Sequence, residues 1–301
     1  MTLPSKVKIV EVGPRDGLQN EASSVPTDVK IELINKLSKT GISTIECTSF
    51  VSPKWIPQLQ DASEVMLGIN KAPNKNYPVL IPNVQGLKDA MKTPIDTIAL
   101  FASASEEFSK KNINCSIDES ITKMRNVANA AKEHNYKIRG YISCVLGCPY
   151  SGKTKMQDII KLVKILDSLG CYEISLGDTI GIGTAKEAVA LVQAVKNELS
   201  IDKIAVHFHD TYGQALVNIY ACLQEGIHIV DSSIAGLGGC PYARGSSGNV
   251  ATEDVVYMLN GLGIETGVKI EDLLEISNFV IKYLGHPARS KVALANLGKM
   301  K

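Results

Sequence analysis

Short apolar segments rich in β-branched residues alternate along the chain with longer segments whose apolar residues recur at helical spacing. Eight of the short segments are predicted strands, at residues 7–12, 44–50, 79–83, 97–102, 137–145, 172–177, 204–208 and 229–235. The longer segments predict amphipathic helices, among them residues 28–38, 117–134, 156–169, 185–199 and 214–225. Because successive strands are joined through helices, the pattern predicts parallel strands with crossover connections.

Eight strand–helix units favour closure into a barrel over an open doubly wound sheet, which more often stops at about five or six strands. We therefore expect an α/β fold, a (β/α)8 TIM barrel over about residues 5–262, and keep the open sheet as the minority alternative. A helical pattern at 253–260 follows the eighth strand within the barrel range. A further pattern at 270–284 predicts a C-terminal helical extension over about 263–301 that could cover one barrel mouth. No linker composition interrupts the 301 residues, so we expect a single catalytic domain over 1–301.

Composition excludes several classes of protein. Hydrophobic residues make up 45% and charged residues 21%, which is typical of a chain with a large core rather than a disordered one. Lys and Arg number 32 against 31 Asp and Glu, without the basic footprint of a nucleic-acid or membrane-surface binder. Neither a signal peptide nor an apolar run of about 18 residues is found. We expect a cytoplasmic protein, with no nucleic-acid or membrane partner and with reduced cysteines.

Polar residues gather where the predicted strands end. In a barrel of this kind the chemistry takes place at the carboxyl ends of the strands. The polar residues found there are Arg15, Asp16, Glu46, Thr48, Ser49, Arg139, Tyr141, Ser175, Asp178, His207, His209, Asp210, Cys240 and Asn249. Their gathering at one end of the predicted barrel indicates an active site.

The strongest local signal is the pair His207 and His209 near the end of an apolar strand. Side chains at i and i+2 share one face of a strand, so two imidazoles could reach one ion. From this pair alone, two hydrogen-bonded histidines are an equally good interpretation. Asp16 could add a carboxylate and Asn249 an amide oxygen, although singly they could stabilise a turn and cap a helix. Imidazole and oxygen donors without a thiolate favour Mg²⁺ or Mn²⁺.

Four other residues are candidates for catalysis. Arg15, beside Asp16, could stabilise an enolate oxygen, or it could form an ordinary surface ion pair. Glu46 interrupts an apolar strand, which is costly for a carboxylate unless it is paired, solvated or functional. Asp178 ends a strand and could equally cap the turn that follows. Cys240 lies in a glycine-rich loop and could assist proton transfer, or be inert.

Four blocks of sequence together carry a resemblance to a known family. They are GPRDGLQNE (13–21), IECTSFVSP (45–53), HFHD (207–210) and SIAGLGGCPYA (233–243). With them the chain resembles the 3-hydroxy-3-methylglutaryl-CoA (HMG-CoA) lyases nearly end to end. The first block is shared in looser form by a wider superfamily of Claisen-type synthases and aldolases, whereas the loop ending in Gly-Gly-Cys-Pro-Tyr is more specific to the lyases.

The resemblance implies an enzyme that cleaves HMG-CoA into acetyl-CoA and acetoacetate, the reaction of leucine degradation and ketone-body formation. It implies the metal ligands Asp16, His207, His209 and Asn249. It places Arg15 on the substrate carbonyl, Cys240 on a catalytic loop, Glu46 in a supporting catalytic role, and Asp178 and Tyr141 in the pocket. We add His207, Asp16 and Cys240 as candidates for the acid–base steps and Ser175 as a substrate-binding candidate.

One departure from the family pattern is Ala22, because the lyases usually carry lysine there. The missing cation puts substrate affinity or a local ion pair in doubt, but it affects no expected metal ligand. We expect an acyl-CoA substrate and a homodimer. The alternatives are another enzyme of the superfamily, such as a synthase or an aldolase, or a noncatalytic acyl-CoA-binding protein.

Overall fold

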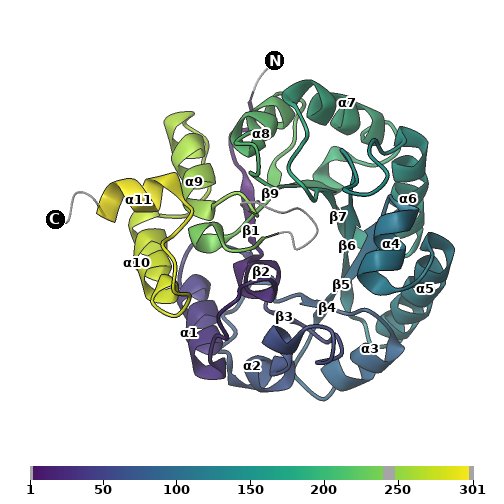
Figure 1. The fold of residues 1–301 in the computed structure, drawn as a ribbon, viewed down its shortest axis with the longest axis horizontal. Helices are drawn as coiled ribbons and strands as arrows, with labels where there is room; N and C mark the ends of the chain where they lie inside the picture. The colour runs from purple at the N-terminus through teal and green to yellow at the C-terminus, as the bar shows by residue number, and fades with distance from the viewer. Residues whose placement is uncertain (1–2, 240–247, 298–301) are drawn as a thin grey trace.

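Parallel strands surrounded by helices make up residues 3–239 and 248–297, the part of the chain that the computed structural model describes (Figure 1). The strands are β1 Lys8–Glu11, β2 Thr44–Ile45, β3 Thr48–Ser49, β4 Val79–Leu80, β5 Thr97–Ser103, β6 Lys137–Ser143, β7 Cys171–Asp178, β8 Ile204–Phe208 and β9 Ile229–Ser232. They pair in the order β2-β1-β9-β8-β7-β6-β5-β4-β3, and each paired strand runs parallel to its neighbour.

The sheet closes into a ring because β2 and β3 are two halves of one barrel strand. Only Glu46 and Cys47 separate them. The backbone N–H of Glu46 donates to the carbonyl of Glu11 in β1 (2.9 Å), whereas the N–H of Cys47 donates to that of Pro78 next to β4 (3.0 Å). The nine strand segments therefore occupy eight barrel positions, and the predicted TIM barrel is confirmed.

The helices form an outer layer around this ring (Figure 1). Those of the barrel are α1 Thr27–Ser38, α2 Ala62–Gly68, α3 Val84–Ala90, α4 Glu106–Ile113, α5 Ile117–Glu133, α6 Met156–Ser168, α7 Ala185–Val195, α8 Ala215–Gln224 and α9 Thr252–Gly261. The five amphipathic helices named from the sequence pattern are all present, with ends that shift by a few residues. In α5 a capping box between Ser116 and Glu119 fixes the first turn.

The predicted C-terminal extension is confirmed as two helices beside the barrel (Figure 1). α10 Ile270–Ile281 packs against α1 and α9, and α11 Lys291–Leu297 packs against α9 and α10. Within 3–239 and 248–297, every helix is too short or too polar to cross a bilayer.

The interior of the barrel is not wholly apolar. Apolar residues such as Val10, Ala99 and Ala205 alternate around the inner layer with polar ones in register, and Arg139, Glu173 and Asp231 are also buried there. Charged side chains are seldom fully buried unless they are paired. These three side chains lie below the candidate site.

Candidate active site and metal centre

Arg15 and Asp16 lie on a short π-helical turn, Gly13–Gly17, that follows β1 directly. Its two end glycines allow the turn to pack closely on its neighbours. A Cβ atom at Gly13 would lie 2.6 Å from Oε1 of Glu11, and one at Gly17 would lie 2.8 Å from the Cβ atom of Leu237. The close packing holds Asp16 over the barrel mouth.

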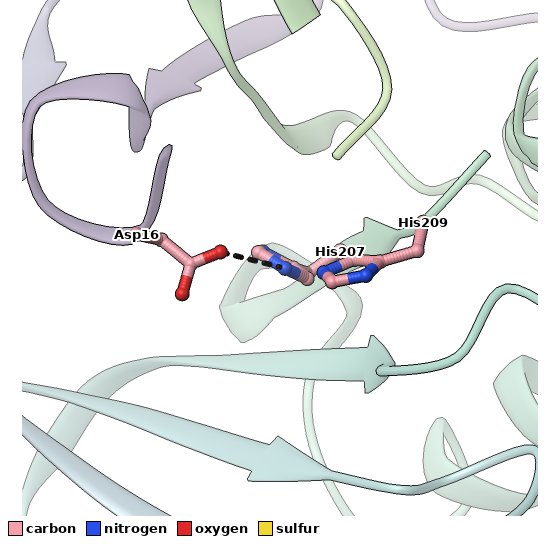
Figure 2. A group of neighbouring side chains, drawn as sticks. All are labelled: Asp16, His207 and His209. Carbon is pink, nitrogen blue, oxygen red and sulfur yellow. Dashed lines mark ion pairs between the residues drawn. The ribbon is translucent and has the colours of Figure 1, made fainter. Parts of the chain in front are cut away.

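Asp16, His207 and His209 form a group that could hold a metal ion, because one ligand atom from each lies within 4.8 Å of the others. Figure 2 shows the Asp16 carboxylate facing the two imidazoles. Oδ2 of Asp16 lies 3.8 Å from Nε2 of His207, which is part of β8, and the two histidine rings are 5.4 Å apart between centroids. Asn249 joins the group, because its Nδ2 atom donates to Oδ2 of Asp16 over 2.9 Å.

The charge states of this group suit a cation. Burial opposes ionisation of Asp16, but the charge of Arg15 and the two nearby histidines lower its pKa to about 2. Burial, together with the neighbouring His207, lowers the pKa of His209 to about 4. A carboxylate and a neutral imidazole are the forms that bind metals. Nδ1 of His209 is also buried and makes no hydrogen bond among the described residues. The donor set therefore fits a divalent ion.

Arg15 is held between two carboxylates. Nη1 lies 2.7 Å from Oδ1 of Asp16, and Nη2 lies 2.8 Å from Oε2 of Glu46. All three side chains are largely buried. Burial raises the pKa of Glu46, although the charge of Arg15 opposes the shift. This arrangement fixes the guanidinium beside the candidate metal site.

Below the site lies a buried network around Asp231, which sequence reasoning missed. Arg139 donates to both Asp231 oxygens (2.6 and 3.1 Å) and to Glu173 (2.6 Å). Ser175 donates to Oδ2 of Asp231 over 2.7 Å, and Nδ1 of His207 lies 3.3 Å from the same oxygen. One signal could have identified Asp231: it is a carboxylate inside an apolar strand, as Glu46 is.

A cavity of about 1130 Å³ opens above these residues. Arg15, Asp16, Tyr141, His207 and His209 all line it. The hydroxyl of Tyr141 is buried and has no hydrogen-bond partner within the described part of the chain. A group with this geometry can donate to or accept from a ligand in the cavity.

Other predicted residues lie elsewhere. Ser175 is fully buried in the Asp231 network and does not line the cavity. Asp178 is also buried, and its Oδ2 accepts from the backbone N–H of Gly183 over 2.8 Å, so it stabilises the turn after β7. Cys240 lies outside the described residues. Asn249 contacts the site through Asp16, and Glu46 contacts it through Arg15.

Comparison with known proteins identifies the family. The model of the HMGL-like family matches residues 6–280. The chain belongs to the HMGL-like family. The match covers most of the barrel and part of the C-terminal extension, so the resemblance carried by the four sequence blocks is confirmed.

Relatives of this HMGL-like chain match it over nearly all its length. The cytoplasmic 3-hydroxy-3-methylglutaryl-CoA lyase of Rattus norvegicus is 55% identical over 294 residues, which cover 98% of this chain and 86% of the relative. The mitochondrial hydroxymethylglutaryl-CoA lyase of Gallus gallus is 56% identical over 292 residues, 97% of this chain and 98% of the relative. The crystal structure of hydroxymethylglutaryl-CoA lyase from Pseudomonas aeruginosa superposes with a TM-score of 0.97 at 51% identity, covering 99% and 100% of the two chains.

Proposed function

We propose that this chain is a hydroxymethylglutaryl-CoA lyase that cleaves HMG-CoA into acetyl-CoA and acetoacetate. The observation that carries the proposal is the convergence of Asp16, His207 and His209 on one point beside a buried Arg15, inside a large cavity. The near-full-length likeness to lyases favours this reaction over the synthase and over a noncatalytic binding protein.

We assign Asp16, His207, His209 and Asn249 as ligands of Mg²⁺ or Mn²⁺. Oxygen and imidazole donors without thiolate suit these ions. The amide nitrogen of Asn249 donates to Asp16 and to the carbonyl of Leu237, so Asn249 would bind an ion through the other atom of its amide, Oδ1. When bound, the cation supplies Lewis-acid stabilisation of the negative charge that develops on substrate oxygens.

The reaction begins with removal of the proton from the tertiary hydroxyl of HMG-CoA. His207, Asp16 and Cys240 are our candidates for this step. Burial lowers the pKa of His207, but its hydrogen bond to Asp231 and the charge of Asp16 raise it overall. His207 serves as the base only when its Nε2 atom is free of the ion, because Nδ1 faces Asp231. The alkoxide then collapses to the ketone of acetoacetate, and the electrons of the broken carbon–carbon bond move onto the thioester as an enolate.

Arg15 stabilises that enolate. Its guanidinium is fixed by Asp16 and Glu46 before the substrate arrives, so little reorganisation is needed as charge develops. Glu46 thereby acts through Arg15. Protonation of the enolate carbon gives the methyl group of acetyl-CoA, and Cys240 is our candidate for this acid.

The cavity has features that fit the rest of the substrate. Its volume of about 1130 Å³ exceeds that of most small-ligand pockets. Tyr141 is our candidate contact for the acyl group, because its hydroxyl has no hydrogen-bond partner among residues 3–239 and 248–297. Lys110, Lys111 and Lys123 also line the cavity, and we assign these cations to the phosphates of CoA. Ser175, which we predicted as a substrate contact, acts in this proposal through Asp231.

The proposal is tested by incubating the protein with a panel of hydroxyacyl-CoA thioesters, with and without a chelator. We expect acetoacetate from HMG-CoA with Mg²⁺ or Mn²⁺, loss of product with EDTA, and recovery when the ion is restored. Absence of acetoacetate under all these conditions, or turnover in the condensation direction only, would reject the lyase.

The role of Cys240 has a separate test. Replacing its thiol with a hydroxyl in Cys240→Ser should slow turnover while Mn²⁺ affinity and the melting temperature stay unchanged. Unchanged kinetics would make the thiol a bystander.

We also infer that the whole of residues 1–301 acts as one catalytic domain and that two copies form a homodimer in the cytoplasm. The adjacent helices α8 and α9 carry exposed Tyr220 and Tyr257, an apolar surface that a second copy could cover. Light scattering of the purified protein tests the dimer. Named relatives include cytoplasmic and mitochondrial forms, so cell fractionation is needed for the compartment.

A further inference from the structure

The segment between α10 and α11 connects two loops at the barrel mouth. Ser23, in the loop before α1, donates its hydroxyl proton to the carbonyl of Leu284 over 2.8 Å. The backbone N–H of Arg289 donates to the carbonyl of Ala235, in the loop after β9, over 2.8 Å. The C-terminal extension therefore touches both the loop that carries Asp16 and the loop that leads to Asn249.

Glu21 is the centre of these contacts. Its side chain is only 4% exposed, although it lies at the barrel rim. Oε2 lies 2.7 Å from Nε2 of His286, and Oε1 lies 3.5 Å from Nη1 of Arg289. The buried carboxylate thus depends on two cationic or hydrogen-bonding groups from the C-terminal segment.

Glu21 and Arg289 also hold the backbone of Gly238, one on its N–H side and the other on its carbonyl side. Its N–H donates to Oε1 of Glu21 over 3.2 Å, and its carbonyl accepts from Nη1 of Arg289. The next carbonyl, that of Gly239, accepts from the side chain of Asn20 over 2.9 Å. Three side chains that bond to these two glycines leave their backbone little freedom.

Gly238 in turn lies directly against Asn249. A Cβ atom at Gly238 would be 2.7 Å from Nδ2 of Asn249, and the backbone there has a φ of +114°, so only glycine fits. That same Nδ2 atom donates to the carbonyl of Leu237 (3.2 Å) and to Asp16 (2.9 Å). A shift of the Leu237–Gly238 backbone would therefore move Asn249 away from Asp16.

We propose that Glu21, His286 and Arg289 are positioning residues that hold Asn249 in place beside Asp16, so that the C-terminal extension helps to shape the cation site. The inference rests on the proposed metal-dependent function. None of the three side chains is a candidate ligand. Glu21 lines the edge of the cavity, whereas His286 and Arg289, the two residues that we would replace, are not among its lining residues. They act through Gly238. Residues that orient metal ligands commonly determine metal affinity as well as the geometry of the ligands.

The test compares Mn²⁺ binding by full-length variants, measured by electron paramagnetic resonance or calorimetry. Arg289→Ala and His286→Ala should each raise the Mn²⁺ dissociation constant about tenfold. This is the lower end of the range that is typical when a residue that orients a metal ligand is replaced. The value of kcat should fall more than KM changes. Arg289→Lys keeps one donor for the Gly238 carbonyl and should recover part of the affinity. Lys282→Ala, an exposed cation at the end of α10, is the matched control and should bind like the wild type.

A merely structural tether would lower the melting temperature and leave Mn²⁺ affinity unchanged in the folded variants. That result would overturn the inference while the lyase activity of the wild type stands. If Arg289→Ala does not fold, Arg289→Met, which keeps the length of the side chain but none of its donors, and His286→Ala carry the same comparison, and wild-type affinity in both would count against the proposal. A wild-type protein that neither binds Mn²⁺ nor cleaves HMG-CoA would overturn the proposed function as well.

Discussion

His207 and Asp231 lie directly opposite each other on the neighbouring strands β8 and β9, with Nδ1 of the imidazole 3.3 Å from Oδ2 of the carboxylate. With Nδ1–H donating to Asp231, the other nitrogen, Nε2, faces Asp16 as an unprotonated ligand (Figure 2). A carboxylate behind a metal-binding histidine fixes its tautomer and its ring orientation.

This relationship predicts the effect of Asp231→Asn. The amide has the same shape, but it removes the negative charge that Arg139 and His207 share, so both metal affinity and stability should fall. We expect Mn²⁺ affinity to drop about 10- to 100-fold. Loss of one partner from a buried ion pair should also lower the free energy of unfolding by about 3 kcal/mol. Calorimetry with Mn²⁺ and urea unfolding measure the two effects.

Ser175→Ala is the control for this variant. It removes one hydrogen bond to the same carboxylate oxygen and leaves all charges in place, so a loss of about 1 kcal/mol is expected. If Ser175→Ala and Asp231→Asn lower Mn²⁺ affinity and the free energy of unfolding equally, the charge of Asp231 is not the cause of the losses.

His209→Ala tests the candidate ligand set. It removes one of the three converging atoms, and we expect loss of Mn²⁺ binding and of nearly all turnover with the far-ultraviolet circular dichroism of the barrel preserved. His228→Ala is the matched control, because His228 directly precedes β9, at the end of the strand opposite to the candidate site, and its ring contacts Gly226 and Asp202. Metal-dependent turnover retained in His209→Ala would remove this residue from the site.

Arg15 and Glu46 should be coupled. Arg15→Gln removes the donor to the enolate and leaves Glu46 buried without its cation, so kcat should fall about 10²- to 10³-fold, as for loss of an oxyanion donor. If Glu46 acts only by holding Arg15, then Arg15→Gln/Glu46→Gln should be no slower than Arg15→Gln alone. A double variant whose losses simply multiply would give Glu46 an independent role.

The stability of the protein should depend on pH through Glu253 at the start of α9. This side chain is fully buried, and burial raises its pKa from 4.5 to about 8, although the N–H of Ala235 donates to it. Because the folded pKa lies above the unfolded one, its contribution is complete below about pH 4.5 and is lost as pH rises through 8.

The Glu253→Gln variant removes this titration. Between pH 5 and 8 the wild type should lose stability relative to the variant, by at most about 1.4 kcal/mol per pH unit. Urea unfolding of both proteins at a series of pH values measures the difference. Parallel curves over this range would show that Glu253 is not protonated in the folded protein.

The barrel could be predicted from the sequence because its strands are buried on both faces and therefore appear as runs of Val and Ile. The HxH pair predicted the approach of His207 to His209, since alternation along one strand is a local property. The partner of Arg139 could not be predicted in this way. Asp231 lies 92 residues further along the chain, and only the register of four adjacent strands brings them together.

Ser175 shows a second limit of the sequence. Its strand position indicated a place near the mouth, but whether a side chain on a barrel strand reaches the cavity or lies in a layer beneath it depends on the tilt and stagger of all the strands. Similarly, no local sequence pattern predicts that the backbone of Glu46 bonds to β1 while that of Cys47 bonds next to β4. This change of hydrogen-bond partner follows from closure of the ring.

Ala22 offers a test of the one departure from the family pattern. It lies exposed on the lining of the cavity, where a lysine would add a fourth cation to Lys110, Lys111 and Lys123. Ala22→Lys should therefore lower KM for HMG-CoA about two- to fivefold, the size expected of an exposed ion pair, with the effect shrinking as salt is added. Mn²⁺ affinity should stay at the wild-type value, because no candidate ligand contacts Ala22. An Ala22→Gln variant controls for side-chain length: if it lowers KM equally, the gain comes from contact with the substrate and not from charge.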